Sequence, residues 1–80
     1  MVTFLLPLHT VLARRGKSRS GHYEEIKEGL FIKPVAISKR SRRYPEHEVE
    51  SIIAARIAGK TDKEIRSLVA KLEAARKQTL

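Results

Sequence analysis

A chain of 80 residues forms one small domain that buries only about 60% of its unfolded surface, so we expect neither a deep catalytic pocket nor an enzyme. It has no cysteine, which excludes a disulfide framework and a cysteine-ligated zinc site, and the spacing of His9, His22 and His47 matches no ligand motif. We therefore expect no metal and no cofactor. The 17 Lys and Arg residues outnumber the 9 Asp and Glu residues to give a net charge of +8, which favours a polyanionic partner over a small-molecule substrate.

The N-terminal run from Met1 to Leu8 is apolar, but it is not typical of a secretory signal. No basic residue precedes it, and Pro7 interrupts it. It is also much shorter than the roughly 20 residues that span a bilayer. We expect an entry segment that packs on the core of a cytoplasmic protein, with no membrane partner.

Two short helices are predicted next, separated by a polar break. Leu8, Val11 and Leu12 follow helical spacing, and Gly16 ends that pattern. Ser18 is a good N-cap for the second helix because its side-chain oxygen can accept from a free amide two or three residues later. We expect this helix to place Tyr23 and Ile26 on its buried face and to stop at Gly29.

A basic hairpin is predicted after Gly29. Apolar or long side chains recur at alternate positions from Phe31 to Ile37, and Pro34 indicates an edge strand because proline cannot donate to a ladder. A polar turn over residues 38–41 leads to a return strand that ends at Tyr44. We expect Phe31, Val35 and Tyr44 to lean on the helices.

Two longer helices complete the chain. Pro45 suits the first position of the third helix, whose expected inward stripe ends at Gly59 and consists of Val49, Ile52, Ile53 and Ile57. The fourth helix begins with a capping box between Thr61 and Glu64. Its apolar stripe, Ile65, Leu68, Val69 and Leu72, predicts packing either on the domain's own core or on a second copy of the chain.

The fold expected from these elements is mainly α with a small β-hairpin, arranged as a winged helix-turn-helix with an additional C-terminal helix. Residues 1–58 are expected to form the DNA-binding domain. Residues 59–80 are expected to form the C-terminal helix, packed on that domain or used for self-association.

The charge is concentrated where this fold meets double-stranded DNA. Residues 1–45 hold ten basic and three acidic residues, net +7, whereas residues 46–80 hold seven and six, net +1. The first turn of a recognition helix enters the major groove, where an arginine such as Arg19 can bind guanine at two points. The hairpin cations suit phosphates or a minor groove. The candidate DNA-binding residues are Lys17, Ser18, Arg19, Ser20, His22, Lys39, Arg40, Arg42 and Arg43.

Three glutamates in the second helix restrict how it enters a groove. Glu24, Glu25 and Glu28 would be repelled by phosphates if the helix lay flat. We expect steep insertion of the first turn, with the carboxylates held away from the backbone or paired with basic residues such as Lys27, Arg14 or Arg15.

A set of motif residues resembles the AlpA family of prophage regulators across about residues 4–58. These residues are Val11-Leu12, Gly16, Ser18-Arg19-Ser20, Tyr23, Ile26-Lys27-Glu28-Gly29, Phe31, Lys33-Pro34-Val35, Arg43 and Val49-Glu50. The resemblance implies a MerR-like, excisionase-like winged helix and a transcriptional regulator of phage or mobile-element genes. It also implies that Ser18, Arg19 and Ser20 are recognition-helix contacts and that residues 39–43 are wing contacts.

Two alternatives stay open at this point. An excisionase-like protein would act chiefly by bending DNA to direct a recombinase. An RNA-binding or ribosome-associated protein would use the same basic residues on structured RNA.

Overall fold

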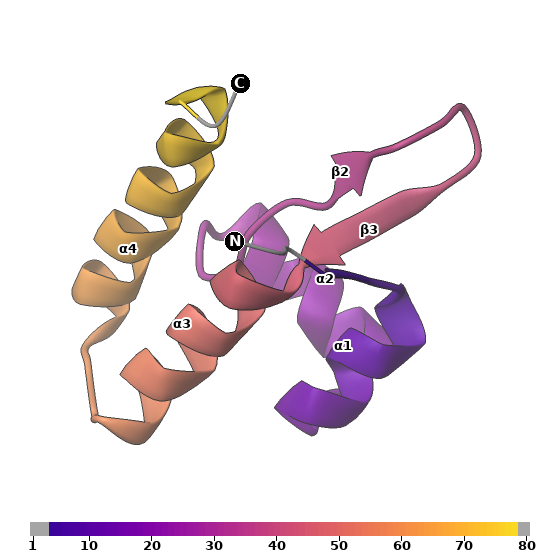
Figure 1. Ribbon diagram of the computed structural model, residues 1–80. Coiled ribbons are helices and arrows are strands. Elements are labelled where there is room, and N and C mark those ends of the chain that lie inside the picture. Colours follow the sequence, from indigo (N-terminus) through magenta and orange to yellow (C-terminus); the bar gives the residue numbers. More distant parts are fainter. Residues whose placement is uncertain (1–3, 79–80) are drawn as a thin grey trace.

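Helices make up most of residues 4–78, the part of the chain that the computed structural model describes (Figure 1). Residues 1–3 and 79–80, which belong to the predicted entry segment and C-terminal helix, lie outside the described residues. The elements in chain order are β1 (Leu5–Leu6), α1 (Leu8–Arg15), α2 (Arg19–Lys27), β2 (Val35–Ala36), β3 (Arg42–Pro45), α3 (Glu46–Ile57), α4 (Asp62–Ala75) and the 3-10 turn η1 (Arg76–Gln78). The prediction of a mainly α fold with a small β-hairpin is thus confirmed.

Local capping signals set the ends of α1, α2 and α4 as predicted, whereas Pro45, expected as the first residue of the third helix, is the extended residue before it and ends β3. Gly16 follows α1 with φ of 65°, a left-handed conformation that favours glycine. Ser18 caps α2 by accepting from the amide of Gly21, and α4 begins at the predicted capping box of Thr61 and Glu64.

Strands β2 and β3 form the predicted hairpin, and β1 adds a third strand on its other side. The order is β1-β3-β2 with both pairs antiparallel, so that Val35 lies opposite Arg43 and Leu6 lies opposite Tyr44. Strand β2 is an edge strand, as Pro34 indicated. The entry segment does pack on the core through the buried Leu6, but its strand pairing was not predicted, because two residues carry no readable periodicity.

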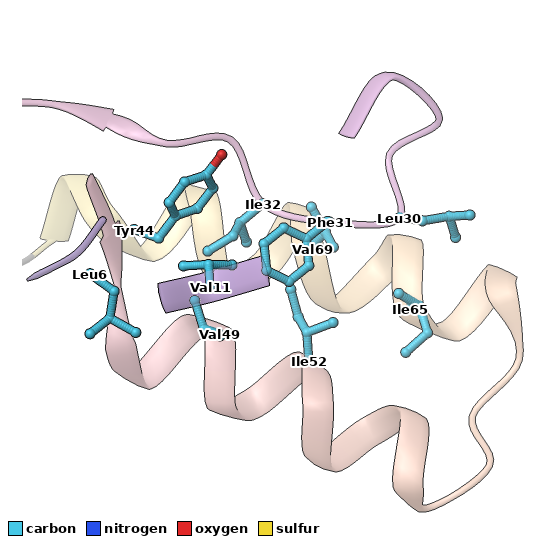
Figure 2. Packing of buried hydrophobic residues seen from close by; sticks show 10 residues of the cluster. All are labelled: Leu6, Val11, Leu30, Phe31, Ile32, Tyr44, Val49, Ile52, Ile65 and Val69. Atoms are coloured by element: carbon cyan, nitrogen blue, oxygen red, sulfur yellow. The ribbon is translucent and has the colours of Figure 1, made fainter. Parts of the chain in front are cut away.

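The predicted alternation from Phe31 to Ile37 is wrong. Leu30, Phe31 and Ile32 are all buried in succession, whereas Ile37 is half exposed at the hairpin. Figure 2 shows this segment as a loop that crosses the interior above α3 and α4. Three consecutive side chains therefore contact the core, which a strand with alternating faces does not allow.

One hydrophobic cluster joins α1, α3, α4, the sheet and the segment 30–32 (Figure 2), and Ile26 of α2 packs against it. Its members are Leu6, Val11, Leu30, Phe31, Ile32, Tyr44, Val49, Ile52, Ile65 and Val69. The prediction that Ile57 lies inward on α3 is wrong, since its side chain is 81% exposed near the helix end, beyond the reach of the cluster.

Helix α4 packs on this same core, so its stripe is used within the chain. Ile65 and Val69 are buried in the cluster, and Leu68 and Leu72 pack against it. Its C-terminal end is also held in place, because Arg76 binds the buried carboxylate of Glu48 at 2.6 Å and the main-chain carbonyl of Lys33 at 2.7 Å.

Candidate nucleic-acid interface

The first turn of α2 presents polar side chains to solvent. Ser18 adopts an extended conformation before the helix, and its side chain accepts from the Gly21 amide at 3.3 Å. Lys17, Ser18, Arg19 and Ser20 are all exposed, as a contact surface requires. The cap thus fixes where the helix begins and which residues lie at its free end.

The side chain of His22 is fully buried, which corrects its prediction as a DNA contact. In its place Tyr23, expected on the buried face, is 49% exposed. His22 and Tyr23 precede Ile26 by four and three residues, and both spacings place a residue on the same helix face as Ile26, so periodicity could not distinguish them. The exposed residues of α2 are therefore Arg19, Ser20, Tyr23, Glu24 and Lys27.

His22 is buried because it links three elements through its ring nitrogens. Nδ1 lies 2.9 Å from Nη1 of Arg15 in α1, and Nε2 lies 2.9 Å from the hydroxyl of Tyr44 in β3. A guanidinium can only donate, so Nδ1 accepts and the Nε2–H donates to Tyr44. Burial, reinforced by the Arg15 charge, lowers the pKa of His22 to about 4.

The guanidinium of Arg15 completes this polar joint. It stacks over the ring of Phe31 at 3.9 Å and donates to the carboxylate of Glu25. Burial favours a raised pKa for Glu25, but hydrogen bonds from Lys17 and Arg15 outweigh it and hold the pKa below the usual range.

Of the three glutamates expected in the second helix, one is paired within the chain and one lies at the end of α2 away from its first turn. Glu25 is neutralised by Arg15, as anticipated, and by Lys17, whose Nζ lies 2.8 Å from it. Glu28 is the C-cap residue, at the end of α2 opposite Ser18. Among the described residues, Glu24 is the glutamate that stays exposed beside Arg19 and Ser20, and Lys17 is paired with Glu25.

The basic hairpin, residues 35–45, projects away from the helices (Figure 1). Lys39, Arg40 and Arg42 are exposed, and the loop is closed by the Ile37 amide, which donates to the carbonyl of Ser41 at 3.0 Å. Arg43 is half-buried, and its guanidinium donates to the carbonyl of Arg42 at 3.0 Å. All four predicted hairpin cations therefore lie on one projecting element.

Three arginines of the two predicted contact regions differ in their pairing from the arginines elsewhere, although Lys17 and Arg43 in the same regions do have internal partners. Outside these regions, Arg14 binds Glu46 and Glu50, Arg15 binds Glu25, Arg56 binds Asp62, Arg66 binds the carbonyl of Glu28, and Arg76 binds Glu48. Within residues 4–78, by contrast, the side chains of Arg19, Arg40 and Arg42 have no hydrogen bond or ion pair. The guanidinium groups without an internal partner are thus gathered at the start of α2 and on the hairpin.

The sequence missed Tyr23 as a residue of this surface. Its signal was present, because Arg19, Tyr23 and Lys27 recur every four residues and so form one line along the helix. Over the described residues, no group of three His, Cys, Asp or Glu side chains could hold a metal ion, and no helix is long and apolar enough to cross a membrane.

No family model, curated protein or solved structure matches the chain.

Proposed function

We propose that the chain is a sequence-specific, double-stranded DNA-binding transcriptional regulator built as a winged helix-turn-helix. In this proposal the first turn of α2 enters the major groove, and the basic hairpin lies on the adjacent backbone or minor groove as the wing. The observation that carries the proposal is the placement of unpaired arginines, Arg19, Arg40 and Arg42, at these two positions. A guanidinium without an internal partner is free to bind a phosphate or a guanine edge.

The acidic residues of α2 are compatible with this docking. Glu25 faces α1 and is paired, and Glu28 lies at the end of the helix that would point out of the groove. Only Glu24 opposes phosphates from the exposed face. Steep insertion keeps Glu24 one turn further from the groove floor than Ser20.

The regulatory role is supported by the resemblance of residues 4–58 to the AlpA family. Relatives of that kind act on phage or mobile-element genes, and we propose the same class of target here. We propose likewise that the protein acts in the cytoplasm and that it catalyses no reaction.

The test is selection of duplexes from a randomised library, followed by binding measurements on the enriched site. Arg19→Ala is expected to relax preference at one base pair, because a two-point arginine–guanine contact is worth about 1–3 kcal/mol of discrimination. Lys63→Ala, on the exposed face of α4, is the matched control and should leave preference unchanged. No enrichment of any duplex sequence, or tighter binding to structured RNA of equal length, would contradict the proposal.

A further inference from the structure

An exposed tyrosine stands where α2 meets the base of the basic hairpin. The ring of Tyr23 packs edge-on against His22, with centroids 5.4 Å apart and an interplanar angle of 74°. On its other side, His22 binds the hydroxyl of Tyr44 in β3. Tyr23 is therefore one side chain away from the hairpin strand.

The Tyr23 hydroxyl is held in place but left without a partner. The ring packs against His22 on one side and is 49% exposed. Burial raises the pKa of Tyr44 to about 12, with a smaller contribution from the nearby phenol group of Tyr23. That contribution agrees with a short distance between the two phenol groups. Among the residues described, the Tyr23 hydroxyl makes no hydrogen bond, so its donor is available.

In the proposed complex, the position of Tyr23 corresponds to the DNA strand between the major and the minor groove. A helix in the major groove and a hairpin on the adjacent minor groove must lie on either side of the sugar–phosphate strand that separates the two grooves. The joint between α2 and β3 then faces that strand. Tyr23 is the exposed donor at the joint, since His22 and Tyr44 are buried.

We propose that Tyr23 is a DNA-contact residue that donates its hydroxyl proton to the phosphate between the two grooves. The inference rests on the proposed function and assigns Tyr23 a role that sets the register of the helix and hairpin on the duplex. It excludes a base-reading role for this side chain. The hydrogen bond is to an anion but adds no protein charge, so it strengthens binding without releasing a further counterion.

The test compares Tyr23→Phe with the unaltered chain on the enriched duplex. Loss of one hydrogen bond to a charged group is expected to weaken binding about tenfold at fixed salt. The slope of log affinity against log salt and the base preference should not change. Ser67→Ala, which removes an exposed hydroxyl from α4, is the matched control and should bind as the unaltered chain does.

Methylphosphonate substitution locates the contact. Each phosphate across the site is replaced in turn by the neutral methylphosphonate, and both proteins are measured on every duplex. At one position, between the major-groove and minor-groove footprints, the tenfold difference between the two proteins should disappear.

Two results would overturn the inference while leaving the proposed function intact: equal binding by Tyr23→Phe and the unaltered chain, or a deficit that persists at every methylphosphonate. A deficit seen with Tyr23→Ala but not with Tyr23→Phe would likewise overturn it, because ring packing would then account for the effect. Failure of the unaltered chain to bind any duplex would contradict the proposed function itself.

Discussion

His22 is a neutral polar residue inside an otherwise apolar cluster, and its two hydrogen bonds explain why it is tolerated there. A buried polar group without partners costs about 1–3 kcal/mol, but here Arg15 and Tyr44 satisfy both ring nitrogens. The ring centroids of Phe31 and Tyr44 lie 5.2 and 5.4 Å from the centroid of the His22 ring. The residue thus holds α1, α2 and β3 in a fixed relation.

Burial of a neutral His22 makes stability depend on pH. Its pKa is about 4 in the folded chain and about 6.5 when unfolded, so the unfolded state binds more protons between these values. The free energy of unfolding should therefore fall as pH drops below 6.5, by about 2 kcal/mol between pH 7 and pH 5. Urea unfolding at a series of pH values measures this loss.

Two variants separate this effect from that of other titrating groups. His22→Leu should be less stable at pH 7 because Arg15 and Tyr44 lose their partner, and its stability should change little between pH 7 and pH 5. His9→Gln, at an exposed position, should keep the full pH dependence. Parallel profiles for His22→Leu and the unaltered chain would count against a buried neutral histidine.

At this scale the sequence predicted the caps but not every side-chain environment. Ser18, Thr61 and Glu64 act on amides within three residues of themselves, so a local pattern is sufficient to identify them. The exchange of His22 and Tyr23 between interior and surface depends on partners that are distant in sequence, above all Tyr44.

At the scale of elements, α4 completes the core that the preceding helices leave open. It contributes Ile65 and Val69 to the cluster, and Glu73 accepts from the main-chain amide of Lys33 at 2.9 Å. Together with the hydrogen bond that Arg76 donates to the carbonyl of Lys33, this contact fixes the segment that leads into the hairpin. We therefore regard α4 as part of the same folding unit as residues 4–58.

A matched pair of isoleucine variants tests this view. Ile65→Ala should lower the free energy of unfolding by about 2–5 kcal/mol because it opens a cavity under α4. Ile57→Ala, at an exposed position, should change it by less than about 0.5 kcal/mol. Chemical denaturation of both variants measures the difference, and equal small effects would show that α4 is not needed for the core.

Helix positions could be predicted because glycines and caps punctuate a clear 3.6-residue pattern. The segment 30–32 and strand β1 could not, because their conformations follow from contacts with distant parts of the chain. Ile57 was misplaced for a related reason. Apolar periodicity continued to the end of α3, but the side chain of Ile57 is 81% exposed there.

At the scale of the whole molecule, the basic residues differ in their position along the chain and also in whether they form an internal ion pair. The sequence predicted the excess of positive charge in the first half. It offered Arg15 as a partner for the glutamates of the second helix, and Glu25 takes that place. It could not show that Arg14 pairs with Glu46 and Glu50, because those residues are distant in the sequence. The arginines without an internal partner are the reason why we propose the start of α2 and the hairpin as the contact surface.

We propose that the hairpin arginines, and not the net charge of the chain, neutralise the phosphates of bound DNA. The most direct measurement is the salt dependence of duplex binding for two charge-matched double variants, R40Q/R42Q on the hairpin and K63Q/K71Q on the exposed face of α4. Each neutralised phosphate contributes about 0.9 to the log–log slope, so R40Q/R42Q should reduce its magnitude by about 1.8 while K63Q/K71Q leaves it unchanged. Equal reductions in both variants, or none in either, would contradict the claim.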